Sequence, residues 1–263
     1  MSTVSYALTD SATMLRRNLR HMLRYPSMTL LILGMPVVFL LLFVYVFGGT
    51  LGAGLAGVAG DRAAYASYVA PGILLITVAA VAQGTAISVA TDMTEGIVAR
   101  FRTMAIWRAS VLTGHVLGST IQSVLSLAVV IGIALLTGFR PTAGAGGWLA
   151  ALGVLVMTSF ALTWLSVGLG LAAKTVETAS NSPMFLLLLP FLSSAFVPTS
   201  SMPAGLRWFA EYQPFTPVID TLRGLLLGTP IGNSAVLAVA WCCFLTLIGY
   251  LWARAVYNRN SVR

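Results

Sequence analysis

The sequence predicts an all-α integral membrane protein with six transmembrane helices, and three observations support this prediction. Hydrophobic residues make up 58% of the 263 residues and charged residues only 8%, against roughly a quarter charged in soluble domains. The mean hydropathy is +0.91. The apolar residues gather in runs about as long as a helix that crosses a bilayer, roughly 20 residues. These features exclude a soluble enzyme and a disordered chain, and they make residues 1–263 one membrane domain.

Six apolar runs are the expected spans. Each of them is expected to be helical, because lipid offers no hydrogen-bond partner to an open sheet edge. The fifth run is the shortest and is interrupted by Pro190. The central parts of the runs contain no Asp, Glu, Lys or Arg, which argues against a proton-coupled carrier. The six runs are 28–47, 68–90, 111–137, 148–172, 183–197 and 235–256.

The basic residues set the expected orientation. Six crossings with a cytoplasmic N-terminus place most of the 15 Lys and Arg residues on the cytoplasmic side, which is the bias that bacterial membrane proteins show. We therefore expect both termini in the cytoplasm and the chain in a bacterial cytoplasmic membrane. The net charge of +8 then reflects topology, and no nucleic-acid partner is expected. The residues expected outside are Arg62, Arg140, Arg207 and Arg223.

Residues 1–25 are expected to form an amphipathic helix along the membrane surface. At 100° per residue, leucines and other apolar residues fall on one stripe and four arginines fall on the far side. Such a helix suits the anionic inner leaflet, so membrane lipid is an expected partner. The alternative is that the basic residues act only as a topology signal. The four arginines are Arg16, Arg17, Arg20 and Arg24.

The loop after the second run, residues 91–108, is the most charged part of the chain. Asp92 followed by Glu95 resembles a capping box, so a helix is expected to begin there. Interleaved apolar and basic residues favour docking on a partner protein at the inner surface, the alternative being a solvated loop that only enforces sidedness. His115, at the start of the third run, has no ligand partner nearby in sequence and is expected at the interface.

The segment 198–230 is too apolar for a free loop and too rich in proline for a span. One short helix is expected from Pro203, and a second one, capped by Thr216 and ended by Gly228, is expected after Pro214. Together they predict a re-entrant hairpin in the outer leaflet; the alternative is an amphipathic loop on the surface. The residues assigned to this hairpin are Pro198, Pro203, Pro214 and Arg223.

The remaining polar residues predict no catalysis. Thr77, Gln83 and Thr85 either bond helices together or line a substrate path. No nucleotide-binding P-loop, metal-ligand cluster or catalytic constellation is present in the sequence. The neighbouring Cys242 and Cys243 are expected to pack in the membrane. We therefore expect no enzyme activity and no cofactor in this chain.

Two blocks of the sequence carry motifs that are found together in one family. The first block contains Pro71-Gly72, Asp92, Gly96-Ile97 and Arg100-Phe101-Arg102. The second contains Phe196-Val197-Pro198, Met202-Pro203, Pro214, Arg223-Gly224 and Gly228. Together they resemble type-2 ABC exporter permeases of the daunorubicin-resistance type, and the likeness covers nearly the whole chain in order. The chain departs from that subfamily at 105–107, where a proline is usual.

The resemblance implies a permease that pairs with a second copy or a related permease and docks two cytoplasmic ATPase subunits, which bind ATP and Mg. It implies drug export, with antibiotics, polyketides or lipids as cargo. The alternatives are export of a polysaccharide or lipid-linked glycan, or a membrane assembly protein without transport activity. The implied coupling residues are Asp92, Glu95, Gly96, Arg100, Phe101 and Arg102.

Overall fold

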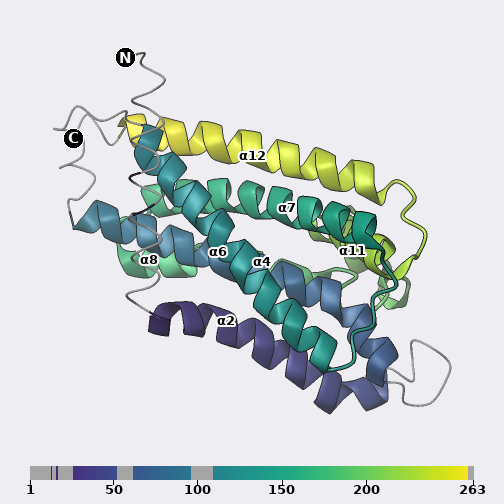
Figure 1. Cartoon of the computed structure of the whole chain (residues 1–263). Helices are drawn as coiled ribbons and strands as arrows, with labels where there is room; N and C mark the ends of the chain where they lie inside the picture. The colour runs from purple at the N-terminus through teal and green to yellow at the C-terminus, as the bar shows by residue number, and fades with distance from the viewer. Residues whose placement is uncertain (1–12, 14–15, 17–25, 52–61, 96–108, 260–263) are drawn as a thin grey trace.

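A computed structural model describes residues 13, 16, 26–51, 62–95 and 109–259 of the chain. All the regular structure in these ranges is helical (Figure 1). The predicted N-terminal helix lies outside the described residues except for Thr13 and Arg16, and so do residues 96–108 of the predicted coupling loop.

Five helices are long and apolar enough to cross a membrane, by length and composition. They match five of the six predicted spans and extend most of them by a few residues. The first continues from an α-helix into a π-helical segment, η1 (Leu42–Phe47). The helices are α2 (Pro26–Leu41), α4 (Arg62–Thr94), α6 (Ala109–Leu136), α7 (Ala145–Ala172) and α12 (Ser234–Arg259).

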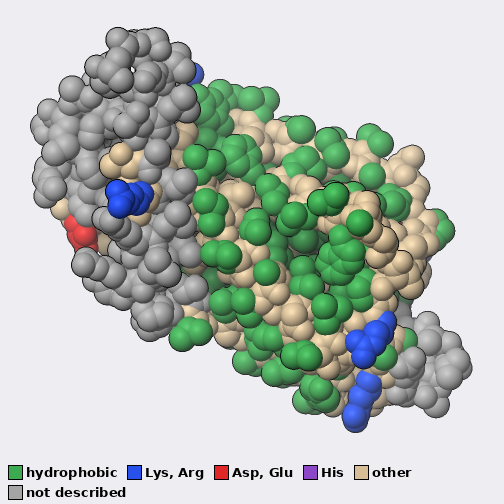
Figure 2. Space-filling view, in the orientation of Figure 1, with side chains coloured by type: hydrophobic (Ala, Val, Ile, Leu, Met, Phe, Trp, Pro, Cys, Tyr) green, Lys and Arg blue, Asp and Glu red, His purple; other side chains and the backbone are tan. Residues whose placement is uncertain are grey.

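Helix α4 is the centre of the bundle. It packs against α2, α6, α7, α8 and α11, and its residues from Val69 to Ala82 are all buried. A helix that is apolar all round and surrounded by other helices is typical of such a core position. By contrast, α2 and α12 expose large apolar side chains such as Leu31 and Val236. Figure 2 shows hydrophobic side chains over the middle of one face, with charged side chains toward the two ends, as expected for a lipid-facing surface.

The bundle has two ends, which we name after the polar residues that mark them. At the Asp92 end, α4 and α12 finish and α6 begins; at the Arg223 end, α4 and α12 begin and α11 lies beside them (Figure 1). Helix α8 (Val176–Asn181) lies at the Asp92 end.

The predicted fifth span, 183–197, is a broken segment. It consists of α9 (Met184–Leu188), the 3₁₀ turn η2 (Leu189–Leu192) and irregular backbone from Ser193 onward. Pro190 has no N–H to donate and fixes its own backbone angle, so the α-helix stops there.

Helix α8 and this broken segment together run along α4 from one end of the bundle toward the other. Ser180 contacts Gln83, and Ser194 contacts Tyr68. Those two α4 positions are 15 residues apart, about 22 Å at 1.5 Å per residue. The approach is close: a Cβ added to Gly72 would lie 2.5 Å from the Cβ of Ala195.

Two short helices follow where the hairpin was expected. Helix α10 (Ala204–Tyr212) begins after Pro203, and α11 (Phe215–Leu227) ends at Gly228, which has φ 75° in the left-handed region that favours glycine. They are preceded by the turn η3 (Thr199–Ser201). The predicted cap by Thr216 is wrong. Helix α11 starts at Phe215, and the Thr216 hydroxyl instead accepts a hydrogen bond from the Ser194 N–H.

The predicted capping box is also wrong. Helix α4 continues through Asp92 to Thr94, and Glu95 lies in the turn that follows, with its N–H donated to the Thr91 carbonyl. Asp92 therefore ends a helix instead of starting one, and its carboxylate finds a partner on another helix.

Candidate functional site

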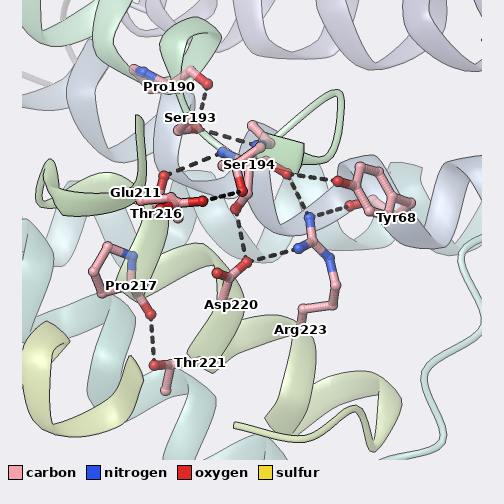
Figure 3. A network of polar contacts seen from close by, with 12 residues as sticks. Tyr68, Pro190, Ser193, Ser194, Glu211, Thr216, Pro217, Asp220, Thr221 and Arg223 are labelled. Carbon is pink, nitrogen blue, oxygen red and sulfur yellow. Dashed lines mark hydrogen bonds and ion pairs between the residues drawn. The ribbon is translucent and has the colours of Figure 1, made fainter. Parts of the chain in front are cut away.

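The polar network at the Arg223 end joins three separate parts of the chain: Tyr68 from α4, Ser194 from the broken segment, and Asp220 with Arg223 from α11 (Figure 3). Arg223 Nη1 donates to Asp220 Oδ1 at 2.9 Å. Ser194 Oγ donates to the same carboxylate oxygen at 2.8 Å. The Arg223 side chain is only 12% exposed, so its charge depends on these partners.

The network also satisfies backbone carbonyls that the broken helix leaves free. The Ser194 carbonyl accepts from Arg223 Nη2 at 2.9 Å and from the Tyr68 hydroxyl at 3.1 Å. Arg223 Nη2 also reaches the Tyr68 carbonyl at 3.3 Å. The guanidinium carbon lies 4.0 Å from the centre of the Tyr68 ring, within the range of a cation–π contact. One arginine therefore holds the irregular backbone against α4.

Gln213 also donates to backbone carbonyls of the broken segment. It is buried between α10 and α11, and its Nε2 donates to the carbonyls of Leu189 and Leu192 at 3.1 and 3.2 Å. Both carbonyls belong to the 3₁₀ turn around Pro190, where the regular helical partners are missing. The hairpin is thereby bonded to the break in the fifth segment.

Aromatic rings close the other side of the broken segment. Phe191 and Phe196 stack at 5.0 Å between ring centres, and Phe196 stacks on Phe43 of η1 at 4.1 Å. Phe39 of α2 meets Phe191 edge to face at 5.3 Å. These contacts fix the first span to the break as well.

The Asp92 end contains a second buried pair. His115 Nε2, on α6, donates to Asp92 Oδ2, on α4, at 3.0 Å, and the side chains are 5% and 13% exposed. Deeper in the bundle, Thr85 Oγ1 donates to Ser119 Oγ at 2.7 Å, and Ser119 shares a 3.2 Å hydrogen bond with Thr163 of α7. We call these five residues the Asp92–Thr163 ladder. It links α4, α6 and α7 through side chains.

The structure describes only three of the predicted coupling residues and N-terminal arginines: Asp92, Glu95 and Arg16. Glu95 is exposed and lies three residues after the partly buried Asp92, and Arg16 is helical and exposed. The remaining predicted residues of these two groups lie outside the described residues: Gly96, Arg100, Phe101, Arg102, Arg17, Arg20 and Arg24.

The predicted hairpin prolines lie at the starts of short helices. Pro198 precedes η3, Pro203 precedes α10 and Pro214 precedes α11. Arg223, predicted at the polar margin of the hairpin, is instead the centre of the network described above.

The three predicted pathway residues are all bonded within this chain. Thr77 Oγ1 donates to the Ile73 carbonyl of its own helix, and Gln83 Nε2 donates to the Ser180 carbonyl at 2.7 Å. Thr85 belongs to the ladder. These bonds account for the polar groups by helix packing, and their part in a substrate path stays a prediction.

Sequence reasoning missed Tyr68, Ser194 and Gln213, and it read His115 without Asp92. The available signal was the cluster of prolines at 183–217. Because proline has no N–H to donate, it leaves backbone carbonyls without a helical partner, and buried carbonyls then need donors from elsewhere. Nothing in the sequence says which donors reach them.

Among the described residues there is no cluster suited to a metal ion, and the crevice beside α7 and α12 is too small for a drug. No group of three His, Cys, Asp or Glu side chains in the described part of the chain is placed to hold a metal ion. A crevice lined by Leu75, Thr158, Trp241 and other apolar residues has about 10 Å³, the room of about one water molecule. Drug-sized ligands need several hundred Å³, roughly 300–1,000.

The sequence matches the ABC-2 type transporter family over residues 10–227. Because the match covers most of the chain, the chain belongs to that family and is a membrane permease. The matched range contains both the Asp92–Thr163 ladder and the Arg223 network.

The chain is similar to a daunorubicin resistance ABC transporter permease protein, DrrB1, of Streptomyces coeruleorubidus, with 31% identity over 85% of this chain and 77% of that protein. It is 24% identical to a probable doxorubicin resistance ABC transporter permease protein, DrrC, of Mycobacterium tuberculosis, over 67% of this chain and 64% of that protein. It is 26% identical to nodulation protein J of Rhizobium leguminosarum bv. viciae, over 84% of this chain and 85% of that protein.

Proposed function

We propose that this chain is the membrane subunit of an ATP-driven exporter of hydrophobic or amphipathic compounds, with an anthracycline-type drug as its best first probe. The observation that carries the proposal is the family match over residues 10–227, together with relatives named for daunorubicin and doxorubicin resistance. The apolar middle of the bundle supports it, because charged side chains among the described residues lie toward the two ends.

The proposal includes an orientation and a sixth crossing. The Asp92 end faces the cytoplasm, since the positive-inside rule places most basic residues there. Helix α8 and the broken segment 183–197 then carry the chain outward, because α7 ends and α12 begins at opposite ends of the bundle (Figure 1). Helices α10 and α11 form the re-entrant hairpin at the outer face.

The partners in the proposal are two ABC ATPase subunits below the Asp92 end and a second permease copy in the membrane. Glu95 supports the docking position, because it is exposed and lies in the turn that follows α4 at the Asp92 end. ATP and Mg bind in the ATPase, and a substrate path forms between the two permeases.

The test is co-purification with a cognate ABC ATPase, followed by a screen for compounds that stimulate ATP hydrolysis. We expect a stable complex and stimulation by daunorubicin or another amphipathic drug. A chain that purifies without any ATPase, and whose presence leaves ATP hydrolysis unchanged by every drug, contradicts the proposal.

Glycan export is the second candidate, because the resemblance of the sequence to type-2 exporters leaves that alternative open. Stimulation by a lipid-linked oligosaccharide and not by drugs would select it.

A further inference from the structure

The Asp92–His115 pair closes the base of the segment that links α4 to α6. Asp92 lies in the last turn of α4, and His115 lies in the second turn of α6. Their 3.0 Å contact therefore joins the two helices just where the connecting residues 96–108 leave one and enter the other.

Burying this pair costs free energy that apolar contacts between the same two helices would not cost. Two side chains only 5% and 13% exposed have lost most of their hydration, and an apolar pair of the same shape would pack equally well or better. The pair contributes a defined orientation of α4 against α6, which apolar contacts alone fix less sharply.

The rest of the ladder extends this orientation to a third helix. Ser119 lies one turn beyond His115 on α6, and Thr85 lies two turns before Asp92 on α4, so both stay on the faces that meet. The 3.2 Å bond from Ser119 to Thr163 then reaches α7. The hydrogen bonds of the ladder therefore join three helices, α4, α6 and α7.

We propose that Asp92 and His115 are positioning residues that make α4 and α6 move as one unit when the ATPase acts on the segment between them. The inference deepens the proposed function and rests on it. Without the pair, the ATPase still binds and hydrolyses ATP. Helices α4 and α6 then no longer move together, and less cargo moves per ATP.

The experiment measures cargo transported per ATP hydrolysed, with tritiated daunorubicin in inside-out vesicles that contain the chain and its ATPase. His115→Ala and Asp92→Ala should each lower this ratio tenfold or more while ATP hydrolysis stays within about threefold of wild type. The reciprocal exchange, Asp92→His with His115→Asp, should restore at least a third of the ratio. Ser166→Ala is the matched control, because its hydroxyl is equally buried without a hydrogen-bond partner among the described residues, and it should leave the ratio within twofold.

Merely weaker folding would lower transport and stimulated hydrolysis together and leave the ratio intact. An unchanged ratio in His115→Ala overturns the inference alone, whereas a wild-type complex that moves no cargo overturns the proposed function. If the alanine variants fail to accumulate, hydrogen exchange in the wild-type complex decides. Peptides 88–95 and 112–119 should change protection together when an ATP analogue binds, and a change in only one of them contradicts the inference.

Discussion

The two ends of the bundle use buried polar groups for different purposes. At the Arg223 end, side-chain donors bind the backbone where the helix is broken, since Arg223, Tyr68 and Gln213 all donate to carbonyls of the broken segment. At the Asp92 end, α4 and α6 are intact, and the bonds run between side chains. We therefore expect the polar groups at the broken helix to contribute more to stability, and those between intact helices to set orientation.

This comparison predicts its largest effect at Arg223. Arg223→Ala removes at once the guanidinium donor to Asp220 and to the Ser194 and Tyr68 carbonyls. It should lower the free energy of unfolding by about 3–5 kcal/mol, because each hydrogen bond from a charged group contributes roughly 1.5–3 kcal/mol. Denaturant unfolding in detergent measures it. Arg207→Ala is the control, because Arg207 also pairs with a carboxylate on its own helix but is 50% exposed, and it should cost less than about 1 kcal/mol. Equal losses for both variants would contradict the structural role of the network.

The next effect is expected at Gln213. Gln213→Leu removes the amide that donates to both the Leu189 and the Leu192 carbonyls and should cost about 1–3 kcal/mol in the same assay. Gln83→Leu removes a single bond to the Ser180 carbonyl and should cost less. A neutral Gln213→Leu would show that the 3₁₀ turn does not need these donors.

A smaller effect is expected where the broken segment touches α4. Gly72→Ala brings a Cβ to 2.5 Å from the Cβ of Ala195. Overpacking destabilises the protein and the higher helix propensity of alanine offsets part of this, so the free energy of unfolding should fall by about 0.5–2 kcal/mol. Gly153→Ala, in α7, meets nothing within 4 Å and should be neutral or stabilising. A shift in melting temperature measures both, and stabilisation by Gly72→Ala would refute the close approach.

The smallest effect on stability is expected in the Asp92–Thr163 ladder. Thr85→Val removes the 2.7 Å bond to Ser119 and should cost about 0.6 kcal/mol, the average for such bonds in membranes. A loss as large as that of Arg223→Ala would show that polar groups at the two ends contribute equally to stability, and would contradict the comparison.

The sequence predicted the long helices well, because apolar runs report directly on burial in lipid. It placed α4 at 68–90 and not 62–94, since the polar residues at its ends carry no hydropathy signal although they continue the helix. The break at Pro190 and the short helices after Pro203 and Pro214 followed from proline stereochemistry.

The polar clusters could not be predicted, because they are made by distant residues. Tyr68 and Ser194 are 126 positions apart, and Tyr68 and Arg223 are 155 apart. Asp92 looked like a helix start because its spacing to Glu95 fits a capping box, and only the position of α6 reveals His115 as the competing partner.

The central claim is that this permease moves cargo only when a separate ATPase drives it. The most direct test is uptake of tritiated daunorubicin by proteoliposomes that contain the purified chain, either alone or with its ABC ATPase, with and without ATP. We predict uptake only when the chain, the ATPase and ATP are all present. Sustained uptake against a gradient by the chain alone, without nucleotide, would contradict the account.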